Sequence, residues 1–198
     1  MAALAEVDGM SALALRFAVL TAARSGEVRG MRWREVDPRT RVWTIPGERM
    51  KARKAHRVPL SGAAVALLRL VQPLRRGPDD VVFPGPRGGK PLSDRSLSKV
   101  VRGMNGGGDP PRWCDHEGRP VVPHGFRATF KVWSMAHGYP DPLSELALAH
   151  ADRDKVRGAC LRADMLEPEA RRPMMEAWAA ECATPREDDR DAPQADAT

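Results

Sequence analysis

Two side chains that could hold an anion stand three residues apart in the stretch P-H-G-F-R-A-T-F: His124 and Arg127. If a helix begins near His124, this spacing places both on one face, where an imidazole and a guanidinium fork can converge on a single phosphate-like group. His150 closes an A-L-A-H segment further along the chain, and Cys160 follows it by ten residues, where a phosphate site would need a nucleophile. The stretch from Pro123 to Cys160 therefore predicts phosphate chemistry.

The charge of the chain points to a polyanionic partner. The 198 residues carry a formal charge of +6, and residues 187–198 hold five acids and one base, so residues 1–186 carry +10. A body this basic is typical of proteins that bind nucleic acid. The end of the chain also lacks an apolar period, so we expect a globular domain over residues 1–183 and a disordered acidic tail over residues 184–198.

Cysteine usage and hydropathy exclude other classes. Three cysteines without a C-x-x-C pair predict neither a disulfide framework nor a cysteine zinc cluster. Cys114 and His116 form a C-x-H pair, which is at most half of a metal site. The longest apolar run, residues 12–23, is interrupted by Arg16 and is too short to span a bilayer. We expect a soluble, cytoplasmic protein that needs no metal or cofactor and does not contact a membrane.

Hydrophobic periodicity predicts a mainly α (α+β) fold in which a small three-stranded antiparallel sheet interrupts the helices. The strands are expected in R-V-W-T-I-P, E-R-M-K and H-R-V-P-L. Arg24 falls between the first two helices, at a corner where a side chain can be aimed. Helices are expected over residues 11–23, from Ser25, over 61–74, from Ser93 or Asp94, and over 123–137, 142–149, 154–163 and 167–183.

The segment from Arg24 to Arg57 is the basic centre of the chain, with eleven bases and four acids. It predicts a nucleic-acid-binding surface, although a solvated charged sheet is the alternative. His56 lies in a predicted strand beside this run and faces either DNA or solvent.

Six short motifs are spread between Ser11 and Cys182: T-A-A-R-S-G-E-V, an M-K before H-R-V-P-L-S, V-F-P-G-P-R-G-G-K-P-L-S, H-G-F-R-A-T-F, A-L-A-H and M-E-A-W-A. In this order the sequence resembles the catalytic domain of a tyrosine recombinase, of the type found in the integrases of prophages and genomic islands. The resemblance covers nearly the whole chain. It implies the helical catalytic-domain fold of that family and the cleavage and rejoining of DNA strands.

The resemblance also implies a role for each candidate site residue. Arg24 and Arg127 would grip the non-bridging oxygens of the scissile phosphate, and Lys51 would protonate the leaving 5′ oxygen. His124 would be the histidine of the second motif, and His150 would assist proton transfer and phosphate binding. Fixed cations can stabilise the charge that gathers on a phosphodiester during transfer, so such a site needs no metal.

Three of these residues have plainer interpretations. Arg24 could simply pair with Glu27 or cap a helix. Lys54 lies close to Lys51, so the choice between these lysines depends on the resemblance. His150 could be a hydrogen-bonded core histidine.

The sequence departs from the family at the nucleophile. The family's H-x9-Y spacing places the attacking tyrosine at position 160, where this chain has Cys160. The only tyrosine, Tyr139, precedes His150 in a predicted turn between helices. A thiolate is a nucleophile, but it is soft toward phosphorus and shorter than a phenol by most of a ring.

Cys160 leaves three alternatives: covalent catalysis by the thiol, loss of activity, or a domain that persists because it binds DNA, with catalysis dispensed with or supplied by a partner protomer. We expect strand transfer to be absent or severely reduced, with double-stranded attachment-type sites as the partner and self-association on the DNA. The alternative function is a non-enzymatic DNA-binding remnant or regulator of a recombinase. A metal-dependent nuclease is disfavoured because the predicted site has no carboxylate cluster for Mg²⁺.

Overall fold

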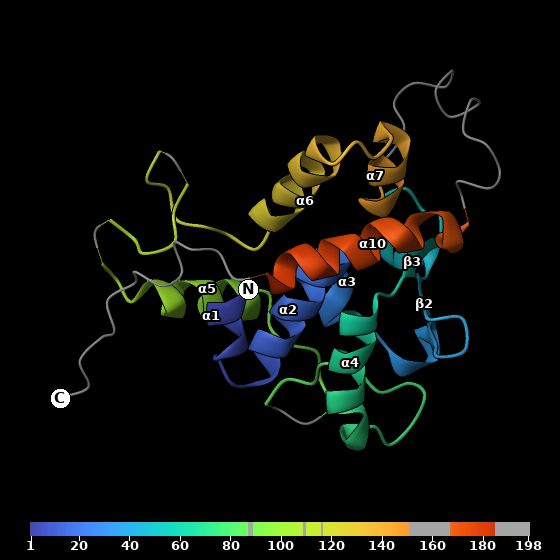
Figure 1. Cartoon of the computed structure of the whole chain (residues 1–198). Helices are drawn as coiled ribbons and strands as arrows, with labels where there is room; N and C mark the ends of the chain where they lie inside the picture. The colour runs from blue at the N-terminus through green and yellow to red at the C-terminus, as the bar shows by residue number, and fades with distance from the viewer. Residues whose placement is uncertain (87–88, 109, 116, 151–166, 185–198) are drawn as a thin grey trace.

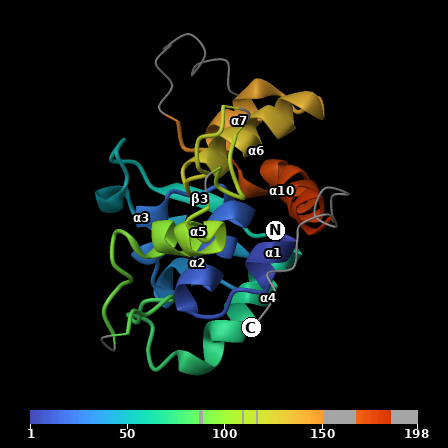
Figure 2. The ribbon, with the colours of Figure 1, turned by 90° about the vertical axis from the view of Figure 1, so that its left-hand side faces the viewer.

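Helix α10 (Pro168–Ala183) lies across the middle of the molecule, between two groups of helices (Figure 1). On one side it contacts α6 (Gly125–Ala136) and α7 (Asp141–Ala147), and on the other side α2 (Met10–Thr21) and α4 (Gly62–Val71). A quarter turn of the molecule shows the same arrangement, with α6 on one side of α10 and α4 on the other (Figure 2). This computed structural model describes residues 1–86, 89–108, 110–115, 117–150 and 167–184.

Shorter elements complete the fold. Helix α5 (Ser96–Asn105) packs on α2, and its observed start lies slightly after the predicted one at Ser93 or Asp94. Within the described ranges, no helix is both long and apolar enough to cross a membrane. The remaining helical elements are α1 (Ala2–Ala5), α3 (Ser25–Arg29), η1 (Trp33–Glu35), η2 (Gly47–Arg49) and η3 (Gln72–Leu74).

Helix α2 forms the centre of the hydrophobic core, as its nearly continuous apolar sequence predicts. The ring of Phe17 has no exposed surface and lies 5.7 Å from Trp43 and 5.5 Å from Phe83, measured between ring centroids. Trp133 and Trp178 form a second aromatic contact at 5.2 Å, between α6 and α10. These rings come from five separate parts of the chain, and all of them belong to one hydrophobic core that includes residues of α2, the sheet, α6 and α10.

The sheet has three antiparallel strands in the order β1 (Val36–Asp37), β2 (Val42–Ile45) and β3 (His56–Pro59). The prediction of a mainly α fold with a small antiparallel sheet is confirmed. The prediction that E-R-M-K forms the second strand is wrong, because residues 47–49 form the single 3₁₀ turn η2. The segment R-V-W-T-I-P, predicted as the first strand, forms β2.

Local hydrogen bonds explain why E-R-M-K does not join the sheet. The amide groups of Arg49 and Met50 donate to the carbonyls of Pro46 and Gly47, at 3.1 and 3.0 Å, so they are not available to a neighbouring strand. A Cβ atom at position 47 would lie only 2.8 Å from the Arg53 carbonyl oxygen, so glycine allows the chain to fold back closely here.

The predicted helix boundaries agree with the structure to within a few residues at most sites. Ser61 caps α4 as expected, because its hydroxyl accepts a hydrogen bond from the Ala64 amide at 3.3 Å. Helix α4 ends at Val71 and continues as η3 to Leu74, the predicted end. The helix predicted over residues 154–163, and the predicted tail beyond Thr184, lie outside the described residues.

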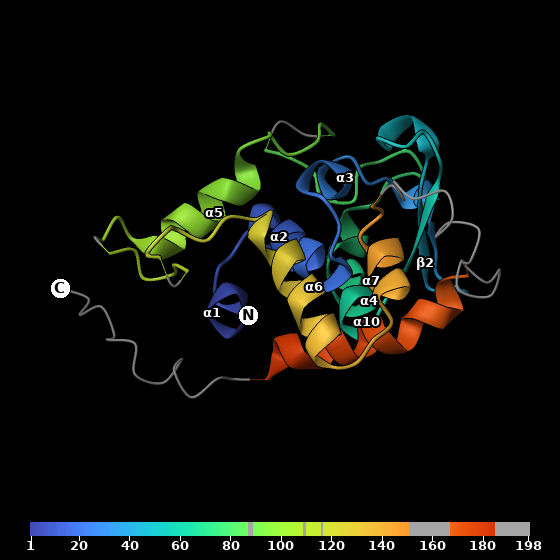
Figure 3. The same ribbon diagram turned by 90° about the horizontal axis from the view of Figure 1, so that it is seen from above.

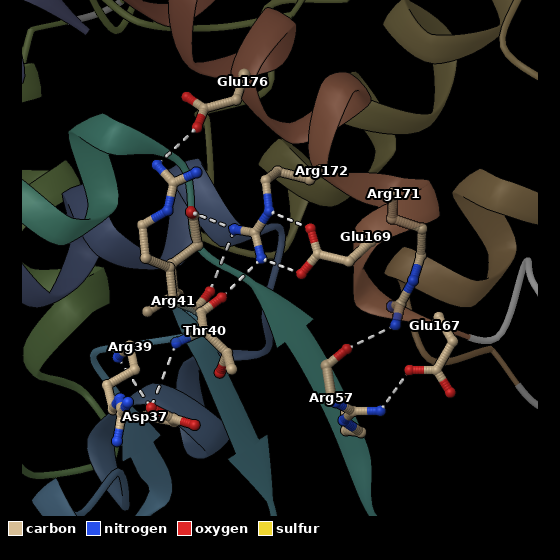
Figure 4. A network of polar contacts seen from close by, with 11 residues as sticks. Asp37, Arg39, Thr40, Arg41, Arg57, Glu167, Glu169, Arg171, Arg172 and Glu176 are labelled. Atoms are coloured by element: carbon tan, nitrogen blue, oxygen red, sulfur yellow. Dashed lines mark hydrogen bonds and ion pairs between the residues drawn. The ribbon is translucent and has the colours of Figure 1, made fainter.

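Polar contacts attach the start of α10 to the sheet (Figure 4). The Arg171 guanidinium donates to the Arg57 carbonyl at 2.7 Å, and Arg172 donates to the carbonyl of Thr40 at 2.7 Å. Glu176 accepts from the first amide of α4, that of Gly62, at 3.0 Å. These contacts fix α10 against β3 and against the N-terminus of α4.

Candidate phosphate-binding site

Arg24 stands at the corner between α2 and α3, as the sequence predicts. Helix α2 ends at Thr21 and is capped by Ala22, which is left-handed with φ of 50°, and Arg24 has extended backbone as the residue that precedes α3. Its Nη1 atom lies 2.8 Å from Glu27 Oε1, and its backbone amide donates to Glu27 Oε2 at 2.8 Å. The side chain of Glu27 is 7% exposed and that of Arg24 is 34% exposed. The predicted pairing with Glu27 is therefore confirmed, and it leaves one third of Arg24 accessible.

Arg127, in the first turn of α6, is buried and held by backbone carbonyls. Its Nη2 donates to the Leu148 carbonyl at 2.6 Å and its Nη1 donates to the carbonyl of Ala22. Burial, and then the positive charge of Arg24, lower the pKa of Arg127 to about 10. The two guanidinium groups thus lie near each other, and Arg127 remains charged at neutral pH. The buried Nε of Arg127 has no hydrogen-bond partner among the residues that the structure describes.

His150 follows α7 and is exposed, so the alternative of a core histidine is wrong. Its Nδ1 lies 2.9 Å from Glu145 Oε2, and the other oxygen of Glu145 lies 2.6 Å from Lys131 Nζ. Burial opposes ionisation of Glu145, but the hydrogen bonds from Lys131 and His150 outweigh it and lower the pKa of its carboxyl. The carboxylate therefore orients the ring through Nδ1, and the imidazole remains exposed.

His124 immediately precedes α6, and its carbonyl accepts from the Arg127 amide at 3.1 Å. The two residues share the first turn of the helix, as predicted, but the side chain of His124 is exposed whereas that of Arg127 is only 5% exposed. They therefore differ in accessibility, although they are neighbours on α6.

Lys51 lies in an exposed turn between η2 and β3. In the described part of the chain, no hydrogen bond or ion pair holds the Lys51 ammonium, and the same is true of Lys54. The structure therefore leaves the preference for Lys51 over Lys54 as a prediction.

His56 is half-buried and lies close to Arg171 and the backbone of Ala147, so the expectation that it faces only DNA or solvent is wrong. Burial and the charge of Arg171 lower its pKa to about 4, against the opposing effects of Glu27 and of a hydrogen bond to the backbone of Ala147. One signal in the sequence could have revealed this position. His56 and the buried Val58 are two residues apart on β3, and such residues point to the same face of a sheet.

Cys160 and His116 lie outside the described residues.

Tyr139 does not compete for the nucleophile position. It packs on Trp133 beyond the C-terminal end of α6, with ring centroids 5.5 Å apart. Arg127 lies in the first turn of that helix, and the C-terminal end of the helix at Ala136 is about 14 Å further along its axis at 1.5 Å per residue. Within the described ranges, no group of three or more His, Cys, Asp or Glu side chains could hold a metal ion.

The described site thus brings together segments that are distant in sequence. Arg127 hydrogen-bonds to residues just before Arg24 and just before His150, so one buried guanidinium joins α2, α6 and α7. Two clustered guanidinium groups beside an oriented imidazole can bind an anion with several oxygens.

Comparison with known proteins identifies the family. The model of the phage integrase family matches residues 1–158. The chain belongs to the phage integrase family. It is 35% identical over 162 residues to the prophage integrase IntA of Escherichia coli strain K12, an alignment that covers 81% of this chain and 36% of the relative. It is 33% identical over 180 residues to the integrase of Shigella phage Sf6, which covers 89% of this chain and 43% of the relative.

Solved structures confirm the tyrosine-recombinase fold. The Tn1549 transposon integrase in complex with transposon right-end DNA superimposes with a TM-score of 0.61 at 16% identity, over 90% of this chain and 63% of that one. The XerH recombinase bound to its difH substrate gives a TM-score of 0.58 at 16% identity, over 85% of this chain and 50% of that one. The chain spans less than half the length of the integrases IntA and Sf6.

Proposed function

We propose that the chain is the DNA-binding catalytic domain of a site-specific recombinase and holds a phosphodiester of double-stranded DNA at Arg24 and Arg127. One observation carries the proposal: two positively charged guanidinium groups lie close to each other. Glu27 holds Arg24, and backbone carbonyls hold Arg127. Cations that are fixed in advance around one point stabilise the charge that develops in a phosphoryl-transfer transition state. Recombinases of the same fold, solved with DNA, support this choice of substrate.

The other site residues take roles around the same phosphate. Lys51 protonates the leaving 5′ oxygen, because an exposed ammonium on a turn can reach a strand that lies across the site. His150 assists proton transfer and phosphate binding through Nε2, since Glu145 engages its Nδ1, and His124 contacts the same phosphate from the start of α6. These residues supply positive charge and protons, so the proposed mechanism uses no metal or cofactor.

Strand transfer by this chain is absent or severely reduced, because Cys160 stands where the family has its tyrosine. A thiol at the same Cα position ends several ångströms short of a phenolic oxygen, and a displacement of about 1 Å already costs a large factor in rate. Binding to attachment-type sites, self-association on DNA and a cytoplasmic location belong to this proposal.

The test is the formation of a covalent adduct on a pool of nicked duplexes with randomised sequence around the nick. A nick beside the cleavage point lets a short fragment diffuse away, so that any protein–DNA link accumulates and is seen on a denaturing gel. We expect an adduct with Cys160→Tyr, and none with the parent chain or with the matched control Cys160→Phe.

Two results would contradict the proposal in different ways. An adduct of the parent chain that disappears in Cys160→Ala would show that the thiol is the nucleophile. If Cys160→Tyr binds the duplexes and forms no adduct, the proposed assembly of the site is wrong.

A non-enzymatic DNA-binding protein is the second candidate, and the cysteine at position 160 favours it. The remnant or regulator would bind through phosphate contacts alone, so its affinity should fall linearly with salt on a double-logarithmic plot. A mobility-shift series at increasing salt, without any adduct from Cys160→Tyr, would support this candidate. No binding at low salt would exclude both functions.

A further inference from the structure

Arg49 connects the turn that carries Lys51 to helix α3, which begins beside Arg24. Its Nη1 donates to the backbone carbonyl of Glu27 at 3.3 Å, and its Nη2 pairs with the carboxylate of Glu35. We propose that Arg49 is a positioning residue, which sets the place of Lys51 relative to Arg24. This inference rests on the proposed role of Lys51 as proton donor.

The acceptor of Arg49 is itself fixed. The side chain of Glu35 is 6% exposed, and its Oε2 also accepts from the indole nitrogen of Trp43 at 3.1 Å and from the Arg32 amide at 3.2 Å. A buried carboxylate with several donors has little freedom to follow a moving partner. Arg49 is therefore anchored to the end of η1 as well as to α3, and through Glu35 it is linked to Trp43 of β2.

Glu27 contacts Arg24 directly and is linked to Lys51 through Arg49. Its carboxylate holds the side chain and the backbone amide of Arg24, and its carbonyl receives the guanidinium of Arg49. Arg49 stands two residues before Lys51, so few rotatable bonds separate this contact from the turn. Figure 3 shows α3 beside the segment between β2 and β3. One residue of α3 thus fixes Arg24 directly and the lysine turn through Arg49.

Gly30 leaves the space that Arg49 occupies. A Cβ atom at this position would lie 2.6 Å from Arg49 Nη1, closer than van der Waals contact permits. The φ of Gly30 is −90°, so its backbone would accept alanine without strain. Gly30→Ala should therefore push the guanidinium away from Glu27 while it keeps every charge. This substitution perturbs the same contact as Arg49→Ala by an independent route.

The contacts of Arg49 with Glu27 and Glu35 matter because, among the described residues, no other side-chain contact within the turn holds Lys51. Lys51 and the residues up to Ala55 are exposed, and Arg53 has a left-handed backbone with φ of 55°. A proton donor must lie within hydrogen-bond reach of the leaving oxygen, and a poorly placed one loses most of its effect. The guanidinium of Arg49 restricts a segment that would otherwise sample many positions.

The first measurement requires no catalysis. Hydrogen exchange of the amides in residues 50–55 and 25–30 is compared for the parent chain, Arg49→Ala, Arg49→Lys and Gly30→Ala. We expect about tenfold faster exchange in both segments with Arg49→Ala and Gly30→Ala, because about 1.4 kcal/mol of restraint corresponds to a factor of ten. Arg49→Lys should fall between them and the parent.

Arg34→Ala is the matched control, because Arg34 pairs with the exposed Asp79 away from the turn. It should leave exchange in both segments unchanged. Unchanged exchange in Arg49→Ala and Gly30→Ala would overturn the proposal, whatever the outcome of the adduct assay.

The second measurement separates positioning of Lys51 from general support of the site. In the Cys160→Tyr background, nicked duplexes carry either the normal 5′ oxygen or a 5′ sulfur as the leaving atom. A thiolate leaves without a proton, so it does not need the proposed proton from Lys51. Arg49→Ala should slow adduct formation about 100-fold with oxygen and less than about threefold with sulfur.

Equal losses with both leaving atoms would overturn the role of Arg49 toward Lys51. If Cys160→Tyr forms no adduct with either duplex, the proposed function fails first, and the exchange measurement decides whether Arg49 holds the turn.

Discussion

The Nη2 atom of Arg127 lies 2.6 Å from the carbonyl oxygen of Leu148, which ends α7 two residues before His150. The same guanidinium donates to the carbonyl of Ala22, two residues before Arg24. Backbone carbonyls carry no net charge, so they fix Arg127 without neutralising it. This arrangement keeps the positive charge of the site while it joins three segments of the chain.

Replacing Arg127 should destabilise the fold as well as the site. Arg127→Met would leave the buried carbonyls of Ala22 and Leu148 without their donors, and each such loss costs about 1–3 kcal/mol. We expect the free energy of unfolding to fall by about 3 kcal/mol in urea titrations. Arg24→Met should cost less than about 1 kcal/mol, because Arg24 is one third exposed and its ion pair is partly solvated. Equal losses for the two variants would contradict the structural role of Arg127.

His56 should make the fold less stable in mild acid. Its pKa is about 4 in the folded chain, mainly because of burial, against an ordinary value of 6.5 for histidine. Between these values the unfolded chain binds a proton that the folded chain does not. This contribution to stability is therefore complete above pH 6.5 and is lost as the pH falls toward 4, by up to about 3 kcal/mol.

The measurement is the free energy of unfolding in urea between pH 4 and pH 7, for the parent chain and for His56→Gln. The groups that face His56 from other elements are Arg171, Arg127, Glu27 and the backbone of Ala147. The two arginines, whose pKa values are about 10, and the backbone of Ala147 do not change charge in this range, so the parent curve should be steeper than that of the variant above about pH 5. Parallel curves would show that His56 is not buried in its neutral form.

Glu145 should set the proton position on the His150 ring. In neutral His150 the proton belongs on Nδ1, because Glu145 Oε2 accepts from that atom at 2.9 Å. Glu145→Gln removes the carboxylate and should shift the ring toward the other tautomer, as seen in nitrogen chemical shifts of labelled histidine. Glu169→Gln is the control, since Glu169 pairs only with Arg172 in the described part of the chain and is distant in sequence. A tautomer ratio that is the same in all three proteins would refute the orienting contact.

Much of the site could be predicted from the sequence because it depends on local spacing. The first turn of α6, the corner at Arg24 and the pair with Glu27 follow from helix periodicity and capping preferences. The carbonyl contacts of Arg127 could not be predicted, since they depend on where α2 and α7 end in space. The prediction of a strand at E-R-M-K was wrong because this segment forms its backbone hydrogen bonds locally, in η2. A short segment next to a single glycine does not reveal this preference for a turn over a strand. The prediction for His56 was wrong because it gave more weight to the basic residues nearby than to the alternation of side chains along β3, which places His56 on the same face as the buried Val58.

Two of the cysteines should differ sharply in reactivity toward a thiol reagent. Cys114 is exposed, whereas burial raises the pKa of the Cys182 thiol to about 12, so almost none of it is thiolate at pH 8. We expect iodoacetamide to modify Cys114 at least tenfold faster than Cys182 in the folded chain, measured by mass spectrometry of peptides. In urea the two rates should converge, which serves as the control for intrinsic reactivity. Rapid modification of Cys182 before unfolding would mean that the C-terminal end of α10 does not pack against α2 and α4 as it does here, and the core described above would need revision.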